Sequence, residues 1–333
     1  MSIVVSKTPL RIPLAGGLTD IKPYAERFGG VTISATIDKY VYVALKQNLD
    51  SFFDLKYQDV HEKAFEASRI KNDLVREALA ITGLTGTPIQ LSIMVDLASE
   101  SGLGSSGAVT VGLLHAMHAL KNGHALEHDD VDPYQLLGEA SRIEVEILQG
   151  ASGYHDPSIC ALGGLKRIDY QVGDHGVDIR ARDIDVSPDT ERAFADSLLF
   201  FYSGRHAKSK PSLDLLSSHL DEAHDVLHDI KALGIELEQA FNAGDLNRIA
   251  EIIGAQQDLK QRLPGRFIDD YVTDVTERVR KVGAYAQLPG GKISAFVIVC
   301  CPGGQHQAVR EALSDLQEVH FGLEPRGTRV TRL

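Results

Sequence analysis

One segment constrains this 333-residue chain more than any other: residues 100–112, which read ESGLGSSGAVTVG. An apolar run (88–95) precedes it, and apolar residues at helical spacing follow it. Glycine permits backbone with positive φ and the close approach of a ligand, and serine caps helix N-termini. A helix that starts near Ser105 would direct its free N–H groups and its positive dipole end into the loop, an arrangement that binds phosphate. For the loop alone, a Gly/Ser-rich helix start without a ligand is the alternative.

Composition and charge narrow the class of protein. Hydrophobic residues make up 43% and charged residues 24% of the chain, as in ordinary globular proteins, and three cysteines form no disulfide or zinc pattern. The net charge of −12 argues against nucleic acid or an anionic membrane as a partner, although not against a small anionic ligand. No apolar run approaches the ~20 residues of a membrane span, and the N-terminus has no signal pattern. We predict a cytoplasmic protein and leave a homodimer open.

The periodicity of apolar residues predicts mixed helices and strands without repeats or a flexible linker. Strands are expected at 3–5, 31–37, 40–46, 52–57, 88–95, 165–170, 177–184, 198–202, 293–301, 319–323 and 328–331. Helices are expected at 69–82, 105–120, 133–148, within 150–165, and at 212–241, 246–261, 267–282 and 305–316. Any domain boundary is therefore expected to be packed rather than tethered.

The glycine loop matches three nucleotide-binding patterns to different degrees. It is not a Walker A loop, because no Gly-Lys-Ser/Thr closes it. Gly102, Gly104 and Gly107 match G-x-G-x-x-G, so a dinucleotide-dependent oxidoreductase stays open, although residues 96–101 separate the strand from the first glycine. The third pattern, G-L-G-S-S-(A/G), places a serine pair at the helix start. One serine, Ser105 or Ser106, caps the helix and the other can reach a metal.

A second segment that contains candidate site residues is 11–20, RIPLAGGLTD. Arg11 leaves a strand, a glycine turn follows, and Asp20 ends the segment. Arginine stays charged and offers a forked set of donors that suits phosphate oxygens, and the carboxylate can accept from substrate hydroxyls. An exposed arginine followed by a turn-forming aspartate is the alternative for this segment alone.

A third segment is residues 143–165. It begins with IEVE, which contains the acids Glu144 and Glu146, and it ends with SGYHDPSICALGGL. Asp156 precedes a proline, so it could be a helix cap only. A carboxylate at a helix start, flanked by glycines, is also well placed to position or deprotonate a hydroxyl nucleophile. Glu144 or Glu146 could reach Mg²⁺, which favours one or two carboxylates together with phosphate oxygens. A solvated helix face is the alternative for these two acids.

Together the three segments resemble the motifs of the GHMP kinase superfamily, which includes galactokinase and the homoserine, mevalonate and phosphomevalonate kinases. Residues 8–43 are most similar to the D-glycero-D-manno-heptose 7-phosphate kinases. The resemblance implies an α+β fold with a ribosomal protein S5 domain 2-like N-terminal lobe (1–185) and a ferredoxin-like C-terminal lobe (186–333). It also implies ATP- and Mg²⁺-dependent phosphorylation of a sugar or sugar-phosphate hydroxyl, with the anomeric hydroxyl of a heptose 7-phosphate or a related sugar expected as acceptor.

The resemblance also implies roles for individual residues. Asp156 would be the base or positioning carboxylate, Arg11 the stabilising cation, and Ser106 and Glu144 the Mg²⁺ ligands. The residues expected to bind the ATP phosphates are Ser101, Gly102, Leu103, Gly104, Ser105, Ser106 and Gly107. The residues expected to bind the sugar are Asp20, Gly17, Thr19, Tyr24, Gly153 and Arg205.

The chain departs from the family near its C-terminus, where the third motif would fall at residues 284–299. A run of small residues is expected there, and PGGKISAF stands instead. Lys292 and Ile293 occupy positions where backbone should pack against the phosphate loop, so Lys292 could add a phosphate contact or narrow the site. A non-catalytic sugar or nucleotide sensor on the same fold is therefore the second interpretation.

Overall fold

The computed structural model describes residues 2–97, 102–123, 131–150, 152–174, 176–205, 210–265, 267–290 and 295–333. Its strands are β1 (Val4–Ala15), β2 (Gly30–Gln47), β3 (Phe53–Tyr57), β4 (Val60–Ala64), β5 (Ile89–Val95), β6 (Leu165–Gly173), β7 (Gly176–Asp183), β8 (Leu198–Tyr202), β9 (Tyr285–Gln287), β10 (Phe296–Cys300), β11 (Gln317–Glu318) and β12 (Arg329–Arg332). Its α-helices are α1 (Lys22–Phe28), α2 (Asp73–Thr82), α3 (Ser105–Asn122), α4 (Pro133–Ser141), α5 (His155–Leu162), α6 (Pro188–Ser197), α7 (Lys210–Ser218), α8 (Leu220–Ala243), α9 (Leu246–Leu259), α10 (Asp270–Lys281) and α11 (His306–Ala312). Short 3-10 turns cover Ala67–Arg69 and Lys260–Arg262, and a π-helical turn covers Arg142–Ile147.

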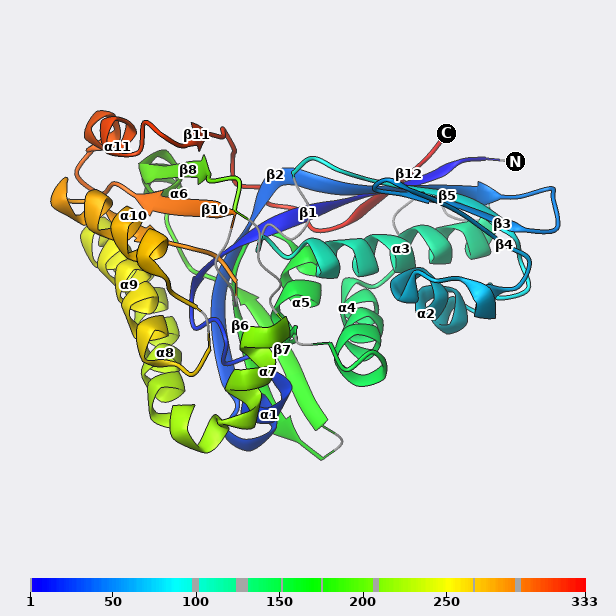
Figure 1. Ribbon diagram of the computed structural model, residues 1–333, viewed down its shortest axis with the longest axis horizontal. Coiled ribbons are helices and arrows are strands. Elements are labelled where there is room, and N and C mark those ends of the chain that lie inside the picture. Colours follow the sequence, from blue (N-terminus) through cyan, green and yellow to red (C-terminus); the bar gives the residue numbers. More distant parts are fainter. Residues whose placement is uncertain are drawn as a thin grey trace.

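The larger sheet is built around two long strands, β1 and β2 (Figure 1). Its order is β12-β1-β2-β5-β3-β4, and β2 also pairs with β6, which pairs with β7. The sequence predicts two strands at 31–37 and 40–46, whereas β2 continues through both. The first part of β2 is buried on both faces, and β1 follows it along its length across two register shifts. Asp38 and Lys39 fall at one of these shifts, because consecutive residues of β1, Pro9 and Leu10, pair with Tyr40 and Ile37 on either side of them. β2 therefore continues as one strand across the two polar residues.

The pairing of β5, the strand before the glycine loop, excludes a dinucleotide-binding fold. β5 is antiparallel to β2, and only its other neighbour, β3, runs parallel to it. A dinucleotide fold needs parallel strands joined by helical crossovers around the glycine loop. The G-x-G-x-x-G match in this chain is therefore not a Rossmann fingerprint.

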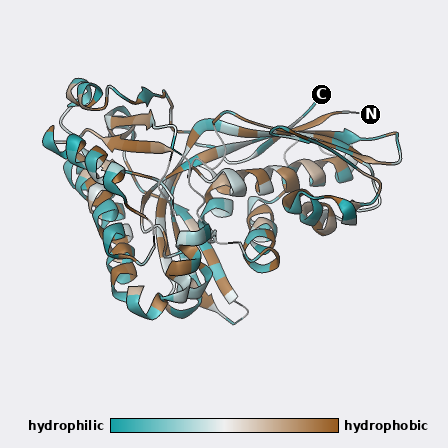
Figure 2. Cartoon of the chain, viewed as in Figure 1, coloured by the Kyte–Doolittle hydropathy of each residue, from teal (hydrophilic) through white to brown (hydrophobic). Residues whose placement is uncertain are grey.

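The smaller sheet has the order β11-β8-β10-β9, and all of its pairs are antiparallel. β10 is buried at every position and appears as a hydrophobic band in Figure 2. Helices α8 and α9 form an antiparallel pair that contacts both sheets, α8 against β1 and β2 and α9 against β9 and β1. Gly244, in the left-handed conformation (φ 70°), ends α8, and the Asp245 carboxylate caps α9 by accepting from the Arg248 N–H (3.0 Å).

Helix α3 packs on the larger sheet, against β1 and β2 and beside α2, α4 and α5 (Figure 1). Its middle part, residues 107–119, is buried at nearly every position, which agrees with the mostly apolar sequence there. A Cβ at Gly112 would lie 3.0 Å from Thr8 Oγ1, and the Ser6 hydroxyl donates to the Gly112 carbonyl (2.8 Å). This close approach of α3 to β1 places the N-terminus of α3 beside the end of β1.

The predicted boundary between residues 185 and 186 falls in the connection from β7 to α6. The division into two domains stays a prediction, and β12 returns from the end of the chain to pair with β1. The sequence patterns do not predict α1, β4, α6 or β9, which are short and lack clear periodicity.

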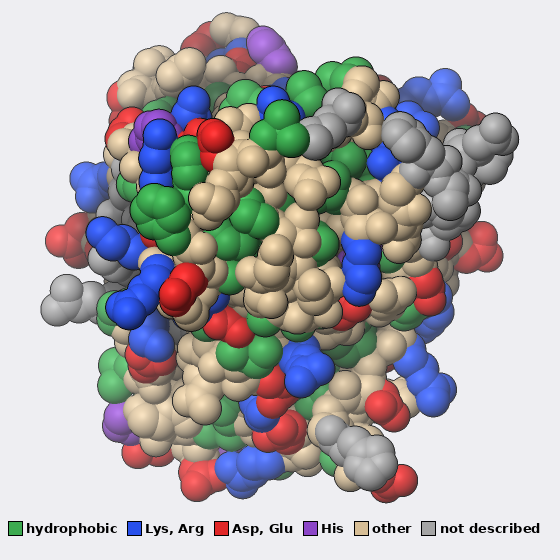
Figure 3. Space-filling model, turned by 90° about the vertical axis from the view of Figure 1, so that its right-hand side faces the viewer, with side chains coloured by type: hydrophobic (Ala, Val, Ile, Leu, Met, Phe, Trp, Pro, Cys, Tyr) green, Lys and Arg blue, Asp and Glu red, His purple; other side chains and the backbone are tan. Residues whose placement is uncertain are grey.

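No helix in the described part of the chain is long and apolar enough to span a membrane. On the face shown in Figure 3, basic and acidic side chains are interspersed. The predicted absence of nucleic-acid and membrane partners and the oligomeric state stay predictions.

Candidate active site

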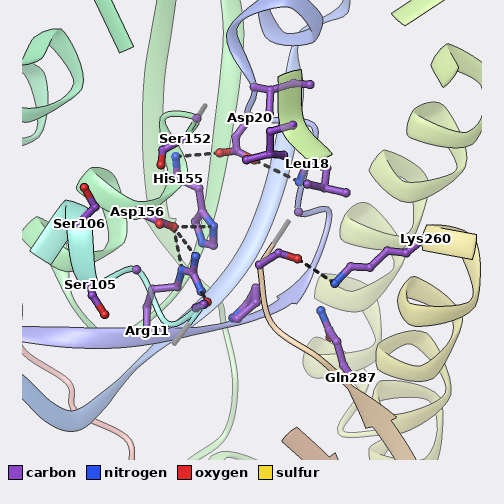
Figure 4. Close-up of a pocket in the computed structure, with 18 of the residues that line it drawn as sticks. Arg11, Leu18, Asp20, Ser105, Ser106, Ser152, His155, Asp156, Lys260 and Gln287 are labelled. Carbon is purple, nitrogen blue, oxygen red and sulfur yellow. Dashed lines mark hydrogen bonds and ion pairs between the residues drawn. The ribbon is translucent and has the colours of Figure 1, made fainter. Parts of the chain in front are cut away.

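A cavity of about 480 Å³ lies where the end of β1, the start of α3 and the start of α5 meet α7, α9 and the 287–290 segment. Its lining residues are Arg11, Pro13, Gly17, Leu18, Asp20, Ile21, Gly102, Gly104, Ser105, Ser106, Ser152, Gly153, His155, Asp156, Lys210, Leu213, Gln256, Lys260, Gln287 and Gly290. The structure thus brings together all three sequence segments that carried candidate chemistry (Figure 4).

Arg11 and Asp156 form the central pair of this cavity. Arg11 lies on β1 with only 4% of its surface exposed, and its Nε and Nη2 donate to Asp156 Oδ1 at 2.8 and 2.5 Å. Its Nη1 donates to the Gly102 carbonyl at 2.6 Å, so the same guanidinium holds the glycine loop. Asp156 stands in the first turn of α5, with its side chain 18% exposed. A fixed cation and an accessible carboxylate therefore meet beside the loop.

The glycine loop is packed directly onto this pair. Gly102 and Gly104 have φ of 81° and 76°, and α3 begins at Ser105, as predicted. A Cβ at Gly104 would lie 3.0 Å from Arg11 Cγ and 3.4 Å from Asp156 Cγ. Glycine is therefore required both by the left-handed backbone and by the space. The N-terminus of α3 opens into the cavity, with Ser105 and Ser106 in its lining.

Glu144 is the buried acid next to the loop. It is 4% exposed, and its Oε2 accepts from the Ser106 hydroxyl at 2.9 Å. Its Oε1 is buried and accepts no hydrogen bond from the described residues. Burial raises the pKa of Glu144 to about 7. Glu146, the other candidate acid, instead faces outward and pairs with Lys22 at 2.5 Å.

Asp20 and Gly153 form a second wall. Asp20 accepts from the backbone N–H groups of Leu18 (3.2 Å) and His155 (3.1 Å), and a Cβ at Gly153 would lie 2.1 Å from its Oδ2. Burial and the negative charge of Asp156 raise the pKa of Asp20 to about 6. This wall presents a carboxylate, held by backbone donors, on the same side of the cavity as Asp156.

Several residues predicted for the site do not line the cavity. Thr19 lies behind the glycine turn, where its hydroxyl bonds to backbone groups of Gly16 and Val31. Tyr24 is buried in α1 against His228, and Arg205 stacks over Tyr271, 4.1 Å from the ring centroid. Leu103 and Gly107 are buried beneath the loop, and Ser101 lies outside the described residues, as do Lys292 and Ile293.

The sequence interpretation missed the wall that α9 and residues 287–290 contribute. Lys260 and Gln256 extend the apolar face of α9, because they lie four residues apart on the same side as Ile252 and are buried. Gln256 Oε1 accepts from the Gly16 N–H at 3.0 Å and so attaches α9 to the glycine turn after β1. Polar residues on an otherwise apolar helix face were the available signal.

His155 is the other missed residue. It is buried in the cavity lining, with its Nδ1 3.6 Å from Asp156 Oδ1 and its Nε2 without a partner among the described residues. Burial, and secondarily the charge of Arg11, lowers the pKa of His155 to about 3. The imidazole is therefore neutral near pH 7, with one buried nitrogen left for a ligand.

The raised pKa of Asp20 predicts a pH-dependent contribution to stability. Because the native state binds this proton more tightly than the unfolded chain, whose pKa is near 3.8, Asp20 favours folding most at low pH. Its contribution falls as the pH rises to about 6, by on the order of 2–3 kcal/mol for two pKa units. We expect the free energy of unfolding of wild type minus that of Asp20→Asn, from urea titrations, to fall by this amount between pH 4 and 7. A pH-independent difference would contradict it.

Comparisons with known proteins also point to the kinases whose motifs the three sequence segments resemble. Residues 65–164 match the family model of the GHMP kinases N terminal domain. Over 306 residues, 87% of each chain, the protein is 26% identical to the D-glycero-alpha-D-manno-heptose 7-phosphate kinase of Campylobacter jejuni. A D-glycero-D-manno-heptose 1-phosphate kinase from Bacteroides thetaiotaomicron superposes with a TM-score of 0.79 at 20% identity, covering 99% of both chains. Phosphomevalonate kinase of Streptococcus pneumoniae superposes with a TM-score of 0.76 at 16% identity, covering 96% of this chain and 99% of its own.

The resemblance to the GHMP kinases is thereby confirmed, together with the predicted α+β fold class. Residues 65–164 match the GHMP kinase N-terminal domain, and over nearly its whole length the chain has the fold of the two solved kinases.

Proposed function

We propose that this protein is an ATP-dependent kinase that phosphorylates a hydroxyl of a sugar or sugar phosphate, with the anomeric hydroxyl of D-glycero-D-manno-heptose 7-phosphate or a related sugar as the acceptor. The observation that carries the proposal is the Arg11–Asp156 pair, which is bonded to the glycine loop at the N-terminus of α3. The likeness to the heptose 7-phosphate kinase of Campylobacter jejuni supports the choice of acceptor.

We assign a role in this reaction to each group of residues that lines the cavity. The N–H groups at the start of α3 and the loop glycines bind the phosphates of ATP. Asp156 accepts a hydrogen bond from the acceptor hydroxyl and takes its proton as the hydroxyl oxygen bonds to the γ-phosphorus of ATP, while the bond from that phosphorus to the oxygen of ADP breaks and ADP leaves. Arg11 stabilises the charge on the transferred phosphoryl group, while Asp20 and Gly153 hold the sugar. Phosphoryl transfer depends mainly on such positioning and charge stabilisation.

The residues around Glu144 fit a magnesium ion. Mg²⁺ prefers one or two carboxylates together with phosphate oxygens and water. The unpartnered Oε1 of Glu144 and the Ser106 hydroxyl lie together at the start of α3, which is the side of the cavity proposed for the ATP phosphates. Glu144 and Ser106 would hold the ion, which would supply positive charge to neutralise the phosphates. Among the described residues no group of three or more His, Cys, Asp or Glu is placed to hold a metal ion, so the proposed site depends on phosphate oxygens and water for its other ligands.

The test is an ADP-release assay of the purified protein with Mg·ATP and heptose 7-phosphates, fucose, galactose or mannose. We expect release with at least one sugar phosphate and none when Mg²⁺ is removed by chelation. ATP hydrolysis without sugar serves as the blank. Binding of a sugar or of ATP without ADP release in any arm would contradict the proposal and favour the sensor interpretation.

A further inference from the structure

The cavity wall opposite Asp156 contains a buried lysine that the catalytic scheme does not use. Lys260 follows α9, is 4% exposed and lines the cavity. Its Nζ donates to the carbonyls of Leu288 (2.8 Å) and Gly290 (3.3 Å). An ammonium group has three protons to donate, so one remains. Within the part of the chain that the structure describes, no carboxylate forms an ion pair with Lys260.

An uncompensated buried cation is costly, which argues that Lys260 has a partner outside the protein. Burial, and then the positive charge of Arg11, lowers the pKa of Lys260 to about 7. Arg11 is already paired with Asp156, whereas Lys260 has only carbonyl partners, so an anion bound beside Lys260 would offset the desolvation of its ammonium and the repulsion from Arg11. A lysine whose only role was to hold the 288–290 segment would be a poor choice, because a neutral donor would cost less to bury.

Two further residues with N–H donors line the same cavity as Lys260. Gln287 is 1% exposed, and in Figure 4 its nitrogen end and the ammonium end of Lys260 both point into the cavity. Lys210, at the start of α7, adds a second lysine to the cavity lining from the exposed side. The carboxylates Asp20 and Asp156 lie on the other side (Figure 4). Both cavity carboxylates therefore lie on one side, where Arg11 is bonded to Asp156, whereas Lys260 and Gln287 lie on the other side without a carboxylate drawn beside them in Figure 4.

We propose that Lys260, assisted by Gln287 and Lys210, binds a phosphate group already present on the acceptor, so that this protein selects a phosphorylated sugar over the neutral sugar. The inference rests on the proposed kinase function and adds the residues that would determine its substrate class. Gly290, whose carbonyl accepts from Lys260, also lies beside the glycine loop, where a Cβ on it would be 3.3 Å from Gly102 Cα. The kinetic test therefore measures KM for ATP as well, to separate the phosphate of the acceptor from the phosphates of ATP. Lysine binds phosphate as a compact charge, in keeping with a site that holds but does not transfer the group.

The test compares Lys260→Met with wild type in steady-state kinetics on a heptose 7-phosphate and on the corresponding free heptose. Loss of one charged hydrogen bond to phosphate should raise KM for the phosphorylated sugar by on the order of 10-fold or more. The kcat on that sugar, KM for ATP and KM for the free heptose should change by less than about 3-fold. The variant Lys210→Met should raise KM for the phosphorylated sugar selectively as well, by a smaller factor. Because Lys210 is exposed and does not hold Leu288 or Gly290, this variant tests the subsite without disturbing the 288–290 segment.

Lys231→Met is the matched control, because Lys231 on α8 also donates to a backbone carbonyl, that of Phe28 (2.8 Å), but lies outside the cavity. It should leave the selectivity unchanged. Equal losses on phosphorylated and free sugar, or a rise confined to KM for ATP, would overturn the inference while the kinase function stands. Wild-type preference for the free sugar would overturn it too.

Calorimetric binding of the two sugars without ATP separates the inference from the proposed function. Tighter binding of the sugar phosphate, lost in Lys260→Met, would support the subsite even in a protein that releases no ADP. Equal binding of both sugars by wild type would overturn the inference.

Discussion

Replacing Asp156 with asparagine is expected to lower kcat by about 100-fold or more, while the affinity for an ATP analogue stays within about 3-fold of wild type. Asparagine keeps the size of the side chain and an oxygen that can accept from Arg11, so the fold and the glycine loop should persist. It cannot take the proton of the acceptor hydroxyl. Steady-state ADP release and calorimetric binding of a non-hydrolysable ATP analogue measure the two quantities.

The control for this prediction is Asp183→Asn. Asp183 ends β7, its side chain is 82% exposed, and it pairs with Lys166 on the neighbouring strand away from the cavity. It should keep full activity. If Asp156→Asn also kept nearly full activity, Asp156 would serve only the first turn of α5, and the proposed chemistry would have no base.

The second large effect is expected from Gly107→Ala, in the first turns of α3. Alanine usually stabilises a helix relative to glycine by up to about 1 kcal/mol. Here the added Cβ would lie 2.7 Å from the backbone carbonyl carbon and Cβ of Asp156 and 2.8 Å from the nitrogen of Pro157. These are atoms at the start of α5 that cannot rotate away. We expect a loss of about 2 kcal/mol in the free energy of unfolding, typical of overpacking, and a lower kcat because Asp156 must move.

Gly138→Ala provides the matched control. Gly138 lies on the exposed side of α4, and a Cβ there would meet no atom within 4 Å. Helix propensity should therefore stabilise this variant by roughly 0.5–1 kcal/mol, with unchanged kcat. Urea denaturation of both variants gives the comparison. A Gly107→Ala protein as stable as Gly138→Ala would show that α3 and α5 are not packed as closely as the structure has them.

The parts of the site that depend on local sequence could be predicted. The glycines at 102 and 104 favour a turn, and the apolar residues after Ser105 have helical spacing, so a helix start at Ser105 could be predicted. That helix start faces the cavity. Arg11, Asp20 and Asp156 were chosen for their chemistry at turns and helix starts, and the structure places all three in one lining. Their catalytic and binding roles stay predictions.

The long-range parts could not be predicted in the same way. Arg205 and Tyr24 were expected near the sugar, but packing places them against Tyr271 and His228, outside the cavity. The sequence places Lys260 in the helix expected at 246–261 and gives it no role in the site. Only the packing of α9 against β1 and β9 turns this lysine inward and shields it from water.

The sequence by itself determined the glycine-rich loop, the helix that follows it and the three segments with candidate site residues, because backbone freedom, helix capping and side-chain chemistry are local properties. The tertiary structure alone decided which candidates share a cavity and what faces them. It bonds Arg11 to Asp156 across 145 positions, leaves one oxygen of Glu144 unpartnered, and sets the buried charge of Lys260 against the cavity. Burial and distance produce the altered pKa values and the polarity of the site, and both arise only when distant segments pack together.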